Sequence, residues 1–181
     1  LIVFPVLDKI ALQPEHLHAR GSSRVAQNLG WPAFVRELRA QGVTVFDPAP
    51  QRLTPDEAPR FLIQDTHWTP AWMERVAGDL AKRIARDIDM PPAHSEHVYH
   101  AVSQQVERVG DFVDMLKLPD DLALFTAQSV TIRQVQDETG APWEPDPDAD
   151  VLLLGDSFSN VCTLDALGWG EAAGLAPHLA L

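Results

Sequence analysis

Two short polar segments of the chain hold residue types that together can do nucleophilic chemistry. One contains Asp65 and His67, and the other contains Ser157, ninety positions after His67. A serine hydroxyl is a weak nucleophile until a base takes its proton, and histidine is the side chain most often used for that step. A carboxylate two residues before the histidine can accept a hydrogen bond from Nδ1, which fixes the tautomer and leaves Nε2 as the base.

Each of these residues also has a purely structural interpretation. Ser157 could simply cap a helix, and Asp65 could cap a turn beside a surface histidine. Asp65 and His67 could also bind a metal, although no further ligand follows them at a telling spacing. Without Ser157 the structural interpretation of the pair would be preferred, so the catalytic hypothesis depends on the serine segment.

The residues around Ser157 predict a strand that ends in a sharp turn. Four aliphatic residues, Val151 to Leu154, have the pattern of a strand buried on both faces of a parallel sheet. Gly155 and Asp156 interrupt this run, and a helix is expected from Phe158 to Leu167 because apolar residues recur at helical spacing. A hydroxyl at this corner would stand above the sheet, and the backbone N–H would face a developing oxyanion.

The Asp65–His67 pair comes shortly before another predicted helix. Thr69 suits the N-cap position and Pro70 the first helical position, so the helix is expected to run from Pro70 to about Asp87. One face of this helix is apolar and should pack on the sheet. Its residues are Met73, Val76, Ala77, Leu80, Ala81, Ile84 and Ile88. The pair is therefore expected in a loop at the start of this helix.

The first fifty residues predict a βαβ unit. A strand is expected at Leu1–Val6, a helix at Pro32–Gln41 and a second strand at Val43–Phe46. Pro32 suits a first helical turn, and Gly42 suits the end of the helix. This order of elements indicates an α/β fold with a parallel sheet and a right-handed crossover.

Residues 89–150 are expected to form an insertion beside the sheet rather than a second core. The segments 98–109 and 125–136 alternate between polar and apolar residues and should pair as an antiparallel ribbon. Asp111 should cap a short helix that reaches Leu116. His94, His97 and His100 recur every three residues, which could suggest a metal cluster, but a strand there would scatter them over two faces.

Composition limits the classes of partner and location. The 181 residues suffice for one domain, and a formal net charge of -12 argues against nucleic acid or an anionic membrane as the main partner. The sequence holds no apolar run of membrane-spanning length and no visible signal peptide. It begins without Met inside a strand-like run, which is typical of a domain cut from a longer protein. The single Cys162 is expected to be a buried, inert thiol.

Taken in order, Asp65-Thr66-His67-Trp68 and Gly155-Asp156-Ser157-Phe158-Ser159 resemble the permuted SGNH hydrolase-like domains of the alginate O-acetyltransferase family. In ordinary SGNH hydrolases the serine block comes first, whereas here it follows the Asp-x-His block. Further stretches fit the family pattern and extend the likeness over most of the chain. They are Val6-Leu7-Asp8-Lys9, Gly110-Asp111 before Met115-Leu116, and Trp169-Gly170 with Ala173-Gly174.

The resemblance implies a flavodoxin-like α/β fold and a catalytic triad. Ser157 would be the nucleophile, His67 the general base and Asp65 its orienting carboxylate, with no metal and no cofactor. Oxyanion or substrate contacts are expected at Trp68, Trp169 and Gly170, because close glycines expose backbone N–H groups and tryptophans stack on sugar rings. The family's oxyanion asparagine and last strands are expected beyond Leu181, so the domain would be truncated.

The resemblance also implies a reaction and a setting. The expected function is transfer of acetyl groups onto exopolysaccharide hydroxyls in the bacterial periplasm, with a membrane-bound acyltransferase as the donor. If water were the acceptor, the same residues would make a carbohydrate acetylesterase. A non-catalytic module that binds polysaccharide or assembles a secretion complex is the alternative outside enzymes.

Overall fold

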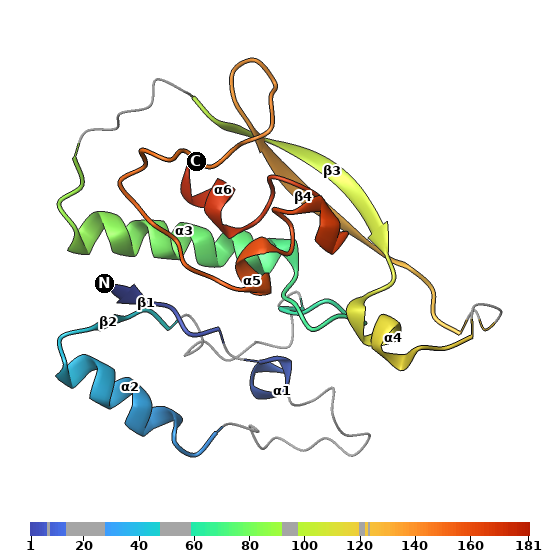
Figure 1. The fold of residues 1–181 in the computed structure, drawn as a ribbon, viewed down its shortest axis with the longest axis horizontal. Helices are drawn as coiled ribbons and strands as arrows, with labels where there is room; N and C mark the ends of the chain where they lie inside the picture. The colour runs from blue at the N-terminus through green and yellow to red at the C-terminus, as the bar shows by residue number, and fades with distance from the viewer. Residues whose placement is uncertain (7, 14–27, 48–58, 92–97, 120–121, 123) are drawn as a thin grey trace. The chain divides into compact units, whose positions relative to one another are not determined.

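The structure is a computed structural model that describes residues 1–6, 8–13, 28–47, 59–91, 98–119, 122 and 124–181 (Figure 1). The chain divides into two units, residues 1–60 and residues 61–181, and each is described by itself. The described residues include no helix with both the length and the apolar character needed to cross a bilayer.

The first unit contains the predicted βαβ arrangement. Its elements are β1 (Ile2–Val3), α1 (Lys9–Leu12), α2 (Trp31–Ala40) and β2 (Thr44–Val45). β1 and β2 pair in parallel, with Ile2 opposite Thr44 and Val3 opposite Val45. The strands are shorter than predicted, but α2 lies between them in sequence as expected. Gly42 follows α2 with a φ of 76°, a left-handed conformation that glycine adopts without strain.

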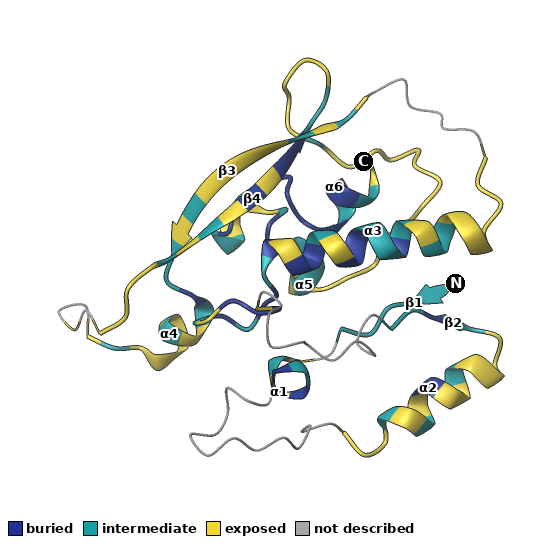
Figure 2. Ribbon diagram, turned by 180° about the vertical axis from the view of Figure 1, so that it is seen from behind, coloured by how far each residue is buried: buried dark blue, intermediate teal, exposed yellow. Residues whose placement is uncertain are grey.

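The second unit is built on α3 (Pro70–Asp87), which begins where the sequence predicts. The hydroxyl of Thr69 accepts a hydrogen bond from the Trp72 N–H at 3.3 Å and so caps the helix. The buried residues of α3 lie between Pro70 and Leu80, toward the N-terminal end of the helix (Figure 2). The helix contacts α6 (Leu175–Leu179) and β4 (Gln128–Gln136). The expected apolar residues Ala81, Ile84 and Ile88 are not buried, so only the first turns of the stripe serve the core.

The predicted antiparallel ribbon is confirmed. β3 (His100–Arg108) pairs with β4 along its whole length, with Gln104 opposite Ile132. The ribbon does more than lie beside the core, because Ile132 and Val135 are buried and β4 contacts α3. The Val135 N–H also donates to the Ala172 carbonyl at 2.8 Å, which ties the ribbon to the C-terminal segment. His100 is exposed on β3, whereas His94 and His97 lie outside the described residues.

The expectation of a buried strand at Val151–Leu154 is wrong. This segment has no regular secondary structure, and the exposed fractions of its side chains range from 36% at Leu153 to 84% at Leu154. Within the described residues it pairs with no other strand. The aliphatic pattern identified a segment suited to burial, but a strand forms only where neighbours take up its backbone hydrogen bonds.

The predicted helix after this segment is also broken. It is divided into α5 (Ser157–Asn160) and a 3-10 helix (Asp165–Leu167). The carbonyls of Cys162 and Thr163, which would continue the helix, instead accept hydrogen bonds from the N–H groups of Ala173 and Ala172 at 2.7 and 3.1 Å. Tertiary pairing with the returning chain therefore replaces the helical hydrogen bonds.

One glycine permits the close approach on which the site depends. α4 (Asp111–Leu116) begins after Gly110, and a Cβ at that position would lie 2.1 Å from the Gln64 carbonyl oxygen and 2.8 Å from the Asp65 Cβ. We expect Gly110→Ala to lower the free energy of unfolding by about 1–3 kcal/mol, because backbone atoms cannot yield as a flexible side chain does.

The matched control for this variant is Gly78→Ala. Gly78 lies inside α3, and a Cβ added there would meet nothing within 4 Å, so alanine should stabilise the helix by roughly 0.5–1 kcal/mol. Denaturant unfolding of both variants measures the contrast. A Gly110→Ala protein as stable as the wild type would contradict the proposed backbone contact.

Candidate active site

The Asp65–His67 pair sits at the tip of a short hairpin-like loop. Phe61 and Trp68 form an antiparallel bridge at its base, and the Leu62 N–H donates to the His67 carbonyl at 3.1 Å. Phe61, Leu62 and Trp68 are all buried, so apolar packing holds the base while the polar residues between them form the tip. The loop ends directly at the Thr69 cap of α3.

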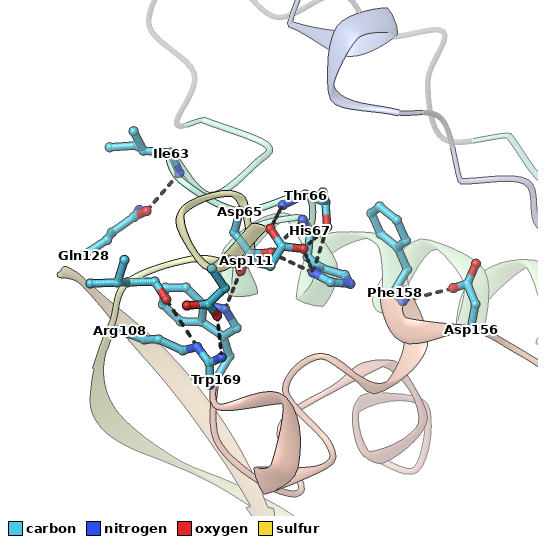
Figure 3. A network of polar contacts seen from close by, with 12 residues as sticks. Ile63, Asp65, Thr66, His67, Arg108, Asp111, Gln128, Asp156, Phe158 and Trp169 are labelled. Atoms are coloured by element: carbon cyan, nitrogen blue, oxygen red, sulfur yellow. Dashed lines mark hydrogen bonds and ion pairs between the residues drawn. The ribbon is translucent and has the colours of Figure 1, made fainter. Parts of the chain in front are cut away.

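Asp65 is the most heavily hydrogen-bonded carboxylate of the site (Figure 3). It is only 2% exposed. Its Oδ1 accepts from the His67 backbone N–H at 2.9 Å and lies 2.6 Å from His67 Nδ1. Its Oδ2 accepts from the Asp111 N–H at 3.0 Å and from the Trp169 indole N–H at 2.9 Å. Four N–H groups from three segments of the chain therefore converge on one carboxylate.

These donors decide the charge of Asp65. Burial alone would raise the pKa of the carboxyl, but hydrogen bonds from the His67 ring, the His67 and Asp111 backbones and the Trp169 indole lower that pKa well below its usual range. The group is therefore ionised at neutral pH and acts only as an acceptor. An ionised Asp65 favours the proton of that contact on His67 Nδ1, which leaves Nε2 as the basic nitrogen of the neutral ring.

His67 Nε2 is a buried nitrogen without a hydrogen-bond partner among the described residues. Buried polar atoms are rarely left in this state, and a functional role is one of the usual reasons. The imidazole faces the ring of Phe158, with 5.0 Å between the ring centroids (Figure 3). The unpaired nitrogen thus belongs to a ring held against the start of α5.

Ser157 is the first residue of α5, directly before Phe158, and its side chain is exposed. It does not cap the helix, because the carboxylate of Asp156 accepts the Phe158 N–H at 3.0 Å. Phe158 also makes edge contacts with Trp68 and Phe61, at centroid distances of 5.6 and 6.4 Å. The three ring contacts fix the start of α5 beside the histidine loop, although no hydrogen bond joins Ser157 to His67 in this structure.

The other predicted contact residues support the site from inside. Trp169 is buried, and its indole N–H is the one donated to Asp65. Trp68 is buried against Phe158. Gly170 has a φ of 98°, and a Cβ there would lie 2.4 Å from the Ile132 Cδ1. In these positions the tryptophans orient and pack the Asp65–His67 loop, and neither ring faces solvent as a stacking surface for sugar would.

Two residues of the site were not singled out by their chemistry in the sequence. Asp111 was expected to cap α4, but Gly110 holds the cap position, and the Asp111 carboxylate turns to Thr66. Thr66 lies 45 positions away from Asp111, so local spacing gives no signal for this contact. Only the family pattern around Gly110-Asp111 had marked the segment.

The same residues form a geometric candidate for a metal site. Ligand atoms of Asp65, His67 and Asp111 all lie within 4.8 Å of one another. However, both oxygens of Asp65 already accept two N–H groups each, and His67 points its protonated nitrogen at that carboxylate. The donor set is thus arranged to orient an imidazole, and a cation there would face N–H groups.

Cys162 plays no nucleophilic part in this arrangement. It is fully buried, and burial together with the nearby carboxylates of Asp65 and Glu74 raises the pKa of its thiol to about 12. The thiol is therefore protonated at neutral pH, as the prediction of an inert cysteine requires.

Comparisons with known proteins agree with this fold. The sequence matches the family model described as SGNH hydrolase-like domain, acetyltransferase AlgX, over residues 1–168. It is similar to the O-acetyltransferase domain of Pseudomonas putida AlgJ, with 23% identity and a TM-score of 0.67, and to Pseudomonas aeruginosa AlgX, with 16% identity and a TM-score of 0.60. No curated protein matches it significantly. The predicted SGNH hydrolase-like α/β fold is confirmed.

The matches cover nearly all of this chain but only part of each matched structure. They cover 98% and 99% of this chain but 59% and 40% of the AlgJ and AlgX structures. The chain therefore spans less than two thirds of either relative.

Removing the Asp65 charge should make stability less dependent on pH. The pKa of Asp65 is lowered by folding, so the unfolded chain binds a proton first as pH falls, and the stabilisation present near neutral pH is lost below about pH 4. We expect Asp65→Asn to lower the free energy of unfolding by roughly 2–3 kcal/mol at pH 7. The difference in this free energy between the wild type and the variant should become smaller in acid. Asp79→Asn, which alters an exposed pair with Lys82, is the control in urea titrations.

The indole N–H of Trp169 can be removed separately. Trp169→Phe takes one donor from Asp65, which moves the pKa of the carboxyl back toward its usual value. The midpoint of acid unfolding should therefore shift to higher pH, and the free energy of unfolding at pH 7 should fall by about 1–3 kcal/mol. Trp143→Phe, a half-buried tryptophan after β4, should leave the midpoint in place. An equal shift in both variants would argue against the assigned role of the indole.

Proposed function

We propose an acetyl-transfer function for this chain on one premise: the chain belongs to the family of SGNH hydrolase-like AlgX acetyltransferase domains. The proposed reaction moves an acetyl group onto a hydroxyl of an exopolysaccharide of the alginate type. Ser157 is the proposed nucleophile, His67 the base and Asp65 the carboxylate that orients the base. The setting in the periplasm and the membrane-bound acyltransferase donor are part of the same proposal and rest on the family resemblance.

One observation carries the proposal. His67 is held by Asp65 through Nδ1 at 2.6 Å, while Nε2 is buried without a partner among the described residues and its ring lies against Phe158, the neighbour of Ser157. An oriented imidazole with one unpaired nitrogen, packed against the residue next to an exposed serine, supports general-base activation of that serine. The proposal requires the Ser157 hydroxyl to reach Nε2 in the working complex, where catalytic hydrogen bonds are often shorter than in ligand-free sites.

The chemistry proceeds in two halves. His67 Nε2 takes the proton of Ser157 as Oγ attacks the acetyl carbonyl, and the negative Asp65 stabilises the imidazolium that forms. The imidazolium returns the proton to the departing donor group, which leaves an acetyl ester on Ser157. A sugar hydroxyl then gives its proton to Nε2 and attacks this ester. The imidazolium returns that proton to Ser157 Oγ as it leaves, so the acetyl group moves to the sugar and the free serine and neutral histidine are regained. General-base action of this kind contributes roughly 10²–10⁴-fold to such steps.

The proposal predicts that acetyl-transfer activity is lost on replacing Ser157 but not on replacing the nearby Ser159. Ser157→Ala should reduce acetyl transfer from a chromogenic acetyl ester by at least about 10³-fold, because the covalent step is removed. Ser159→Ala, in the same helix turn, should retain activity within a few fold. The measurement uses the full-length protein, and a Ser157→Ala enzyme with undiminished transfer would refute the proposal.

The acceptor is decided in the same assay. Products are compared with and without an oligosaccharide acceptor, and acetylated oligosaccharide is the expected product. Acetate formed at the same rate in both conditions would instead identify an esterase. Labelling by a fluorophosphonate probe provides the second readout, and a Ser157 that is never labelled while glycan still binds would support a non-catalytic module.

A further inference from the structure

We propose that Asp111 is a positioning residue that selects the working tautomer of His67, acting through the hydroxyl of Thr66. This inference rests on the proposed function of the same site. It concerns which ring nitrogen of His67 carries the proton. It gives a positioning role to a carboxylate that is not one of the three proposed triad residues.

Asp111 holds the residue between the two members of the pair. Its Oδ1 accepts the Thr66 backbone N–H at 2.7 Å, and its Oδ2 accepts the Thr66 hydroxyl in a short hydrogen bond. Its own backbone N–H donates to Asp65 Oδ2 at 3.0 Å. One residue of α4 thus contacts both Asp65 and Thr66, and through Thr66 it fixes the backbone that leads into His67 (Figure 3).

The direction of the Thr66 hydroxyl proton follows from these contacts. A hydroxyl has one proton to donate, and the carboxylate of Asp111 takes it. The Thr66 oxygen therefore presents only lone pairs to His67 Nδ1, which lies 3.3 Å away. Nδ1 then faces three oxygens that accept, since Asp65 Oδ1 is at 2.6 Å and Asp111 Oδ2 at 3.8 Å. Only a protonated Nδ1 fits these surroundings.

Without the Asp111 carboxylate the hydroxyl would be released. The Thr66 proton could then turn to Nδ1, where a hydroxyl donor favours the unprotonated nitrogen and places the ring proton on Nε2. A ring with its proton on Nε2 cannot take the serine proton. The Asp111 carboxylate thus opposes the tautomer that would inactivate the base.

Asp111 differs from a carboxylate that only forms a surface ion pair with a basic side chain. Among the described residues the side-chain partners of its carboxylate are Thr66 and His67, whereas the neighbouring Arg108 pairs with Asp114 at 3.3 Å. Asp114 lies on the same short helix, and its carboxylate pairs with Arg108. It therefore provides the matched control for a charge change on α4.

The test replaces the carboxylate by an amide of the same shape. In Asp111→Asn the amide oxygen can still accept the Thr66 N–H, but the amide nitrogen donates to the Thr66 oxygen and turns the hydroxyl proton away. We expect kcat for acetyl transfer by the full-length protein to fall roughly 10- to 100-fold with KM within about twofold. Asp114→Asn should stay within about twofold of the wild type on both parameters.

Thr66→Val, which removes the competing hydroxyl, should restore part of the kcat lost in Asp111→Asn. Asp111→Glu, which keeps the negative charge, should have a kcat much closer to that of the wild type than Asp111→Asn has. Rescue by both supports the proposal. Independent losses that multiply in the Asp111→Asn/Thr66→Val double variant would overturn it, as would an Asp111→Glu protein as impaired as Asp111→Asn.

A spectroscopic readout distinguishes this proposal from the function on which it rests. In ¹⁵N-histidine-labelled protein, with the His67 signal assigned by its loss in His67→Gln, the neutral ring should be protonated at Nδ1 in the wild type and shift toward Nε2 protonation in Asp111→Asn. An unchanged tautomer in folded Asp111→Asn overturns the inference even if acetyl transfer is confirmed. A changed tautomer supports it even if Ser157 proves not to be the nucleophile.

Discussion

The site depends on the solvation of one buried carboxylate by the protein itself. Asp65 has exchanged water for four N–H groups, supplied by the His67 ring and backbone, the Asp111 backbone and the Trp169 indole. A buried charge is tolerated only when its hydrogen bonds are replaced in this way. Because the donors come from sequence positions up to 104 residues apart, folding of the whole second unit is required before the carboxylate can be charged and buried together.

This constraint links distant elements. Trp169 reaches Asp65 because the returning chain pairs with the Cys162–Thr163 carbonyls and with β4. Asp111 reaches it because Gly110 lets α4 approach the Gln64 backbone. The same contacts that replace water around Asp65 therefore place α4, the ribbon and the C-terminal segment around the loop. Orientation of the imidazole is then a result of the tertiary fold and not of the Asp-x-His spacing alone.

The sequence predicted the elements whose signals are local. Thr69 and Pro70 mark the start of α3, period-two alternation marks the ribbon, and Gly42 marks the end of α2, and each appears as expected. The Asp65–His67 contact was also predictable, since two residues of separation suffice for it. The segment before Ser157 was not, because an aliphatic run shows what could be buried but not which strands are present to bury it. The roles of Trp169 and Asp111 were missed for the same reason, since both depend on contacts made across long stretches of chain.

The burial of Cys162 has a practical consequence. This lone thiol lies five positions after Ser157, behind the short α5, and is sealed under the returning chain. A water-soluble disulfide reagent can reach the thiol only when the chain around it opens locally, so the reaction rate of the unaltered protein reports how often the Cys162–Ala173 pairing separates. The native thiol therefore reports local opening of this part of the fold without any introduced label.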